Sequence, residues 1–196
     1  MDKDKPVGTS LASHIALSKQ QCPQKEEEKE YMDRVPYVSA IESVMYAMIC
    51  CRPDIAYVVS QVSRYMANLG KEHWKALKWV LRYLQGTRSL GLIFGYQGGL
   101  GRTSDDSGNV SGPLEGFVDA DYAGDWDTRR STIGYIFSMY GGPISWRSIL
   151  QPITTLSIIE AEYIGIIETA KEDLWLQRLI MEMGVEQKTV VLHSDS

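Results

Sequence analysis

The first half of the chain repeats apolar residues at the spacing of helices. The first segment with this spacing begins near Tyr37, after Pro36. The second starts at Pro53, a residue suited to a first helical turn, and can end at Gly70. A third covers residues 71–86 and closes with a glycine. The apolar positions that define them are Ile41, Val44, Met45 and Met48, then Ile55, Val58, Val59 and Val62, then Trp74, Leu77, Leu81 and Leu84. We therefore predict three consecutive helices.

Short apolar runs separated by turn signals replace this pattern in the second half. They predict β-strands, because they are rich in β-branched and aromatic residues. The expected strands are Leu114–Asp121, Thr132–Met139, Pro143–Arg147 and residues 189–195, preceded by a short strand-like stretch at 90–96. A long helix is expected from Ser157 to Met183, where SIIE resembles a capping box and Gly184 follows the end. The order of three strands, one helix and one strand predicts an α/β fold of the α+β kind.

These patterns divide the chain into four segments. Residues 1–35 form a turn-rich, partly acidic lead-in with little to bury, so we expect it to be loosely structured. Residues 36–97 form the helical segment, and 114–196 form the strand-rich domain. Between them, residues 98–113 read GGLGRTSDDSGNVSGP, a polar, glycine-rich sequence that predicts a linker.

Composition narrows the classes of function. The formal net charge of −5 gives no global signature of a nucleic-acid binder, so any such surface would be local. No apolar run approaches the length of a membrane span, and the first residues lack the apolar segment of a signal peptide. The three cysteines, Cys22, Cys50 and Cys51, suggest neither a disulfide framework nor a zinc site. We expect an intracellular protein that is neither secreted nor bound to a membrane.

Three acidic residues lie where an enzyme would use them. Asp119 lies in or at the end of an apolar strand, Glu162 lies in the long helix, and Asp195 follows the last strand. Acids on separate elements can converge on Mg²⁺, which prefers carboxylate and water oxygens. Each acid also has an ordinary structural interpretation: a turn for Asp119, a solvated helix face for Glu162, a terminal position for Asp195. Spacing alone leaves both interpretations open.

Two groups of basic residues are candidates for phosphate contacts. The third predicted helix carries Lys71, Lys75, Lys78 and Arg82 at helical spacing, which predicts a single basic face. Such a face is equally typical of the solvated side of an amphipathic helix. The second group comprises Arg129, Arg130 and Arg147, close in sequence to the strands of the proposed acidic site.

Several motifs together resemble one known family. The blocks GFVDADYAGDWDTRRSTIGYIF, GGPISWRS, LSIIEAEY, ETAKEDLWL and VVLHSDS look like consecutive parts of the RNase H domain of Ty1/copia-type retrotransposons. Upstream, VPYVSAIESVMYAMICCRPDIAYVVSQVSRYM and KEHWKALKWVLRYLQGT resemble the segment that joins this domain to the reverse transcriptase. The resemblance covers essentially the whole chain and identifies it as part of a Pol polyprotein.

The resemblance implies a fold and an activity. The fold would be a partial RNase H-like one: a mixed sheet with three antiparallel strands, and a helix leading to the fourth strand. The activity would be hydrolysis of RNA in RNA–DNA hybrids with two Mg²⁺ ions, Mn²⁺ being a possible substitute. The remainder of the Pol polyprotein would be a partner, in the cytoplasm within a virus-like particle, or in the nucleus.

The family's acidic residues carry over to three positions. Its first aspartate falls on Asp119, its glutamate on Glu162 and its second aspartate on Asp195, so these residues would be catalytic and would hold the metal ions. Asp121 and Glu160 are the alternatives if the alignment is displaced by two residues.

The sequence also departs from the family pattern. The last catalytic acid, the later helices and the last strand would lie beyond Ser196, and the polymerase signature Y-x-D-D is absent. Ile158 and Ile159 stand where the family more often has threonines. Two hypotheses follow: a truncated, impaired ribonuclease H, or a noncatalytic remnant that at most binds nucleic acid or a partner.

Overall fold

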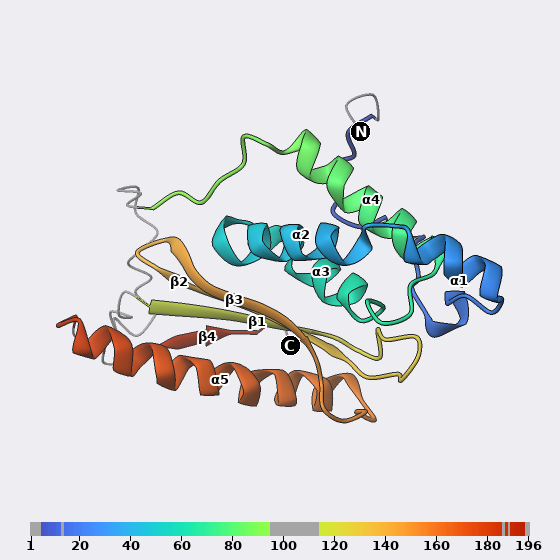
Figure 1. Cartoon of the computed structure of the whole chain (residues 1–196). Helices are drawn as coiled ribbons and strands as arrows, with labels where there is room; N and C mark the ends of the chain where they lie inside the picture. Colours follow the sequence, from blue (N-terminus) through green and yellow to red (C-terminus); the bar gives the residue numbers. More distant parts are fainter. Residues whose placement is uncertain (1–4, 13, 95–113, 186, 188, 195–196) are drawn as a thin grey trace. The chain divides into compact units, whose positions relative to one another are not determined.

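The computed structural model describes residues 5–12, 14–94, 114–185, 187 and 189–194, and the chain divides into two compact units, Met1–Gly91 and Leu92–Ser196 (Figure 1). The predicted linker, residues 98–113, lies outside the described residues. Each unit has a hydrophobic core of its own.

The first unit is helical. Its elements are η1 (Lys19–Gln21), α1 (Glu26–Asp33), α2 (Tyr37–Cys51), η2 (Pro53–Ile55), α3 (Ala56–Ser63) and α4 (Lys71–Gly86). The core joins α2, α3 and α4 through side chains at the predicted helical spacing, including the fully buried Ile41, Val58, Val62 and Leu77. The three predicted helices are therefore present.

Two details of this unit differ from the prediction. Gly70 does not end the second helix: α3 stops at Ser63, and Gly70 is the N-cap of α4. The lead-in also holds more structure than its composition suggests, since it contains η1 and α1 and buries Leu17 in the core. The acids in the first turn of α1 complement the positive end of the helix dipole, which explains how so polar a segment forms a helix.

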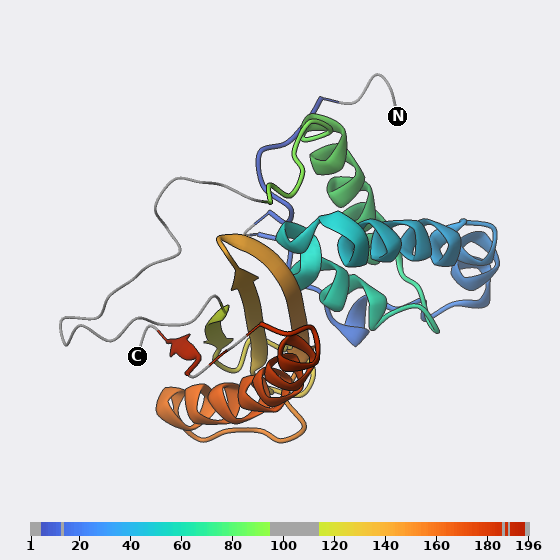
Figure 2. The same ribbon diagram turned by 90° about the vertical axis from the view of Figure 1, so that its left-hand side faces the viewer.

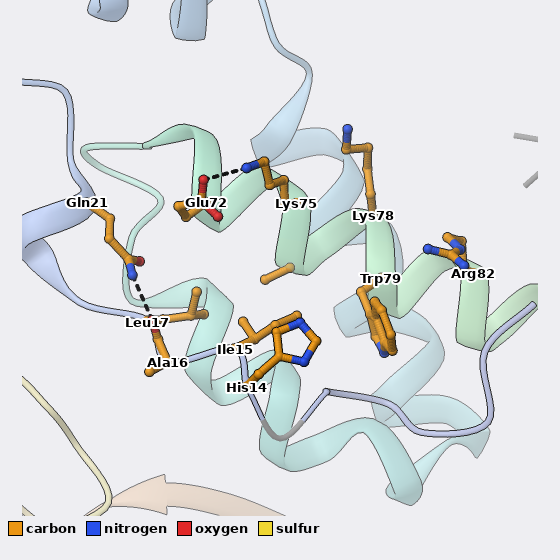
Figure 3. A pocket seen from close by; sticks show the side chains of 11 residues that line it. His14, Ile15, Ala16, Leu17, Gln21, Glu72, Lys75, Lys78, Trp79 and Arg82 are labelled. Carbon is orange, nitrogen blue, oxygen red and sulfur yellow. Dashed lines mark hydrogen bonds and ion pairs between the residues drawn. The ribbon is translucent and has the colours of Figure 1, made fainter.

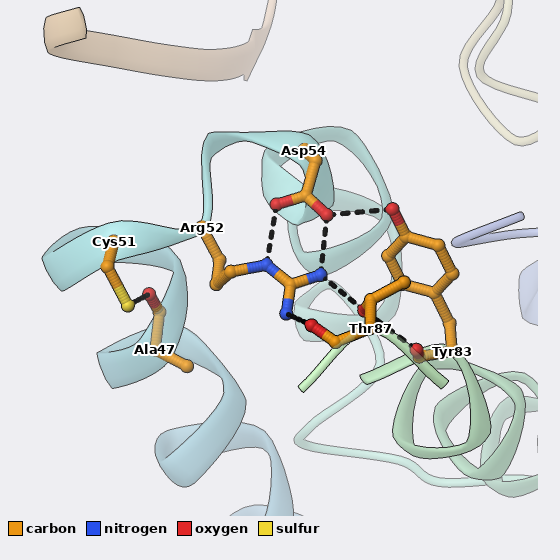
Figure 4. Close-up of polar contacts among 6 residues, drawn as sticks. All are labelled: Ala47, Cys51, Arg52, Asp54, Tyr83 and Thr87. Carbon is orange, nitrogen blue, oxygen red and sulfur yellow. Dashed lines mark hydrogen bonds and ion pairs between the residues drawn. The ribbon is translucent and has the colours of Figure 1, made fainter. Parts of the chain in front are cut away.

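A buried arginine fastens the start of η2 to the end of α4 (Figure 4). Arg52, only 6% exposed, donates from Nε to Asp54 Oδ1 at 2.9 Å and from Nη2 to Asp54 Oδ2 at 2.7 Å. It also donates to the carbonyl and hydroxyl of Thr87, and Tyr83 donates to Asp54 Oδ2 at 2.8 Å. The hydrogen bonds from Arg52 hold the pKa of Asp54 below its usual value, while burial raises the pKa of Tyr83.

The second unit is a sheet covered by one helix. Strands β1 (Leu114–Asp121), β2 (Thr132–Met139) and β3 (Gly142–Leu150) pair antiparallel, and β4 (Val191–His193) adds to β1 in parallel. The spatial order is β3-β2-β1-β4. The predicted α+β class and strand directions are confirmed.

Helix α5 (Ile158–Glu182) runs along one face of this sheet (Figure 2). Val118, Ile133 and Phe137 point into the core that α5 covers, and Leu176 and Ile180 meet them from the helix. A Cβ built on Gly165 would lie 3.4 Å from Val118 Cγ2, so a glycine at this position allows the helix to approach β1 closely.

The strand bounds depart from the prediction at three places. Residues 90–94 form no strand, because no neighbouring segment pairs with them among the described residues. Strand β3 continues to Leu150, since its pairing with β2 extends that far, and β4 is shorter than predicted.

Candidate functional site

Asp119 lies on the face of the sheet that α5 does not cover. Along β1 the burial alternates, so Val118 and Ala120 point toward α5 while Asp119 is exposed on the opposite side. Its partner on β2 is Gly134, and a Cβ added there would meet no atom within 4 Å. The space beside the Asp119 carboxylate is therefore open to a ligand.

Glu162 has the opposite environment. It lies in the second turn of α5, on the side that faces the sheet, and is 5% exposed. A carboxylate is rarely buried unless it is paired, hydrogen-bonded or bound to a metal. The solvated-face interpretation of Glu162 is therefore wrong, and its burial makes it the more distinctive of the two described acids.

Asp195 lies outside the described residues, so the structure does not place the third predicted acid. The described pairing of β4 with β1 ends where His193 meets Phe117. These two rings stack, with centroids 4.8 Å apart and planes 17° apart. This contact sets the register of β4 against β1 at Phe117, two residues before Asp119.

The alternative acids are already engaged in local structure. The carboxylate of Asp121 closes over Gly124, so close that a side chain at position 124 would collide with it. Glu160 accepts a 2.7 Å hydrogen bond from the backbone N–H of Leu156, while Ser157 accepts one from the N–H of Glu160. Both acids therefore stabilise turns or the start of a helix.

A buried polar network that the sequence did not reveal positions the start of α5. Gln151, fully buried, donates from Nε2 to the carbonyl of Ala161 at 2.8 Å, and its backbone N–H donates to the carbonyl of Ser131. Ser131 in turn lies 3.0 Å from the Thr155 hydroxyl. Because Ala161 directly precedes Glu162, the network ties the start of α5 to the segments just before β2 and just after β3. The only signal in the sequence was a run of polar residues before the helix cap.

The described residues do not by themselves complete a metal site. Within the part of the chain that the structure describes, no three His, Cys, Asp or Glu residues form a group that could hold a metal ion. Asp119 lies on β1 and Glu162 in the second turn of α5, so the two acids come from different elements. Their all-oxygen donor set is nevertheless the one that Mg²⁺ prefers.

The three candidate arginines have different surroundings. Arg130 donates to Thr128 Oγ1 and to the carbonyls of Gln151 and Pro152, so it fastens a loop. Arg129 is exposed, with its backbone at φ 57°. Arg147 is exposed on β3 opposite Tyr135. Since Tyr135 points to the α5 side, Arg147 lies on the other side of the sheet from Asp119.

The four basic residues of α4 differ in their neighbours. Lys71 lies 3.9 Å from a carboxylate oxygen of Glu28, and its ammonium is above the Tyr31 ring. By contrast, Lys75, Lys78 and Arg82 line a cavity of about 530 Å³ between α4 and the lead-in (Figure 3).

Comparisons with known proteins identify the family. Over all 196 residues the chain is 50% identical to the "Retrovirus-related Pol polyprotein from transposon TNT 1-94" of Nicotiana tabacum, of which it spans 14%. It is 35% identical over 182 residues to the Pol polyprotein from transposon RE2 of Arabidopsis thaliana, of which it spans 11%. It is also 43% identical, over 145 residues, to "Secreted RxLR effector protein 161" of Plasmopara viticola, and covers 94% of that protein. No family model and no solved structure matches.

The chain belongs to the retrovirus-related Pol polyproteins of copia-type transposons, of which it represents a segment. Within the described residues, no helix is both long and apolar enough to cross a membrane. The name of the Plasmopara relative includes the word secreted, which does not agree with the expected intracellular location. The location of this chain stays a prediction.

Proposed function

We propose that the chain comprises the end of a reverse transcriptase and the first part of an RNase H domain, which hydrolyses RNA paired to DNA. The observation that carries this proposal is the buried carboxylate of Glu162, held on α5 beneath β1, the strand that bears Asp119. The order β3-β2-β1-β4, with a parallel β4, agrees with the fold that the family resemblance implies.

Asp119, Glu162 and Asp195 would hold the Mg²⁺ ions, with Mn²⁺ as a possible substitute. Phe117 of β1 pairs with His193 of β4. Asp119 comes two residues after Phe117, and in the sequence Asp195 comes two residues after His193. In parallel strands, residues at equal offsets from a paired position lie side by side, so Asp195 is expected near Asp119. The metal ions would supply activation of water and stabilisation of the leaving oxygen.

The residues of the chain have separate tasks in this proposal. Asp119 contributes a carboxylate at an open surface that a duplex can approach, because Gly134 leaves the neighbouring position empty. The Gln151 network fixes the first turns of α5 and with them Glu162. Arg129 is the arginine best placed for a phosphate, since Arg130 fastens a loop and Arg147 lies on the α5 side.

A second candidate function is that of a noncatalytic remnant that binds nucleic acid or a partner. It is favoured by the apolar residues at the start of α5, where Leu156 is 88%, Ile158 60% and Ile159 79% exposed. Exposed apolar groups of this size are typical of a contact surface rather than of a solvated catalytic edge.

Cleavage of an end-labelled RNA–DNA hybrid in Mg²⁺ separates the two candidates. The variants are Asp119→Asn and Glu162→Gln, and Glu115→Gln serves as the control because it lies on the same strand and the same face as Asp119. The ribonuclease candidate predicts that the unchanged chain and the Glu115→Gln control cleave the hybrid. It also predicts that Asp119→Asn and Glu162→Gln do not. Absence of cleavage by folded protein would favour the remnant.

A further inference from the structure

The helix of the second unit has an apolar face that points away from the sheet. Its four large side chains are between 41% and 64% exposed: Tyr163, Ile167, Leu174 and Met181. The first three each precede a buried residue by two positions, namely Gly165, Thr169 and Leu176. Two residues correspond to about 200° around a helix, so the exposed set lies opposite the side of α5 that packs on the sheet (Figure 2).

The exposed residues are spaced as in a coiled-coil seam. Successive intervals of four, three, four, three and four residues join the six members of what we call the α5 seam: Tyr163, Ile167, Ala170, Leu174, Gln177 and Met181. This is the heptad spacing with which one helix packs along another. The face is therefore suited to a second helix.

A polar residue in the α5 seam indicates that the second helix is α5 of another copy. Gln177 donates from Nε2 to Asp173 Oδ2 at 2.8 Å. In a parallel, in-register pair Gln177 would lie beside the same residue of the other copy, whereas an antiparallel pair centred on the seam would place it against the apolar Ile167. A single polar core position sets the register of a coiled coil, because a polar counterpart satisfies it best.

The charges beside the α5 seam also complement each other in a parallel pair. Among the described residues, the exposed Arg178 has no carboxylate within ion-pair distance, and Asp173 has no cation within that distance. Burial raises the pKa of Asp173, which is expected of a carboxylate without a cation beside it. In parallel heptad pairs, the residue before a core position lies next to the residue five positions later on the other helix, so Asp173 of one copy would meet Arg178 of the other.

We propose that α5 forms a parallel, in-register pair with α5 of a second copy of this chain through the α5 seam. The seam is roughly 27 Å long. A helix pair of this length buries of the order of 1,000 Å² in total, which is near the lower limit for a specific interface, so association in the micromolar range is expected. Glu162 is buried on the sheet side of α5, so the pairing does not depend on the proposed hydrolysis.

Two neighbouring residues of α5 provide a matched test. Leu174 lies in the α5 seam and Trp175 lies outside it, and both are 57% exposed. Sedimentation equilibrium of the 196-residue chain, in EDTA and without nucleic acid, should show a monomer–dimer equilibrium. Leu174→Glu should weaken the dimer about tenfold or more, because it places a charge in the seam, and Trp175→Glu by less than about twofold. Arg178→Glu should weaken it about three- to tenfold, and added salt should reduce that loss.

The parallel arrangement has a test of its own. Gln177→Cys should form a disulfide between two copies on oxidation, and Trp175→Cys should not. Both variants keep Cys22, Cys50 and Cys51, so the difference between them carries the result.

Three outcomes would overturn the proposal. A chain that stays monomeric would exclude the pairing, and equal losses for Leu174→Glu and Trp175→Glu would mean unspecific apolar association. Dimers in which Gln177→Cys does not cross-link would exclude the parallel, in-register arrangement. Unchanged circular dichroism of the variants excludes unfolding as the cause of any loss.

Discussion

The side-chain amide of Gln151 donates a 2.8 Å hydrogen bond to the carbonyl of Ala161, the residue directly before Glu162. Both residues are fully buried, so water cannot replace this bond if it is lost. A glutamine at the end of β3 thereby sets the position of a carboxylate on the following helix.

Replacing Gln151 by alanine should destabilise the second unit by about 2–3 kcal/mol, since it removes a buried hydrogen bond and leaves a cavity. Urea denaturation followed by circular dichroism measures the effect. Thr154→Ala is the control, because Thr154 is exposed and its hydrogen bond is long, at 3.4 Å. Similar midpoints for the two variants would mean that the Gln151 bond does not stabilise the fold.

Two buried glycines of the second unit should respond differently to alanine. A Cβ at Gly116 would lie 2.7 Å from a ring carbon of Phe137 and would also collide with Leu192, so Gly116→Ala should cost about 1–3 kcal/mol. At Gly165 the nearest atom would be 3.4 Å away, and helix propensity favours alanine by about 1 kcal/mol. We expect a lower melting temperature for Gly116→Ala and an equal or higher one for Gly165→Ala. The reverse order would contradict the packing described for β1.

Gly134→Val tests whether the open space beside Asp119 is functional. A Cβ at this position would meet no atom within 4 Å, and valine favours strands, so stability should be unchanged or higher. If a duplex approaches Asp119 there, cleavage of the RNA–DNA hybrid should fall at least tenfold. A stable variant that cleaves like the parent chain would place the substrate elsewhere.

The Arg52–Asp54 pair predicts a specific dependence of stability on pH. The hydrogen bonds from Arg52 make the pKa of Asp54 lower in the folded than in the unfolded state. The stabilisation is therefore complete above the unfolded pKa of about 3.9 and is lost as pH falls through the lower folded value. Urea midpoints should show that Asp54→Asn costs about 1–2 kcal/mol at neutral pH and progressively less in acid. Asp33→Asn, at an exposed acid outside the pair, should show no such convergence.

The elements with regular apolar spacing were predictable from sequence, because burial of one face dictates that spacing. The bounds of α4, β1 and β2 agree with the prediction residue for residue. The end of α3 was not predictable, since Gly70 has no side chain and suits either end of a helix. Its role at the start of α4 depends on His73, whose Nδ1 accepts the Gly70 N–H at 2.9 Å.

The candidate site was predictable only in part. The motifs indicated Asp119 and Glu162 as acids, but their opposite environments depend on which way β1 and α5 turn their faces. The Gln151 network was not predictable from the polar residues before the helix cap alone, because its bonds join residues far apart in the chain. For the predicted basic face of α4, helical spacing does not reveal that Lys71 lies beside Glu28 while the other three basic residues line a cavity. Contact of this face with phosphate stays a prediction.

The two separate cores have a consequence for cooperativity. Every buried residue of one core lies between Leu17 and Val80, and every one of the other between Leu114 and Ile180. A chain with two separate hydrophobic cores need not unfold as one cooperative unit, so a single melting temperature does not describe it. Heating should produce two calorimetric transitions, and a destabilising substitution such as Gly116→Ala should displace one of them and leave the other where it was.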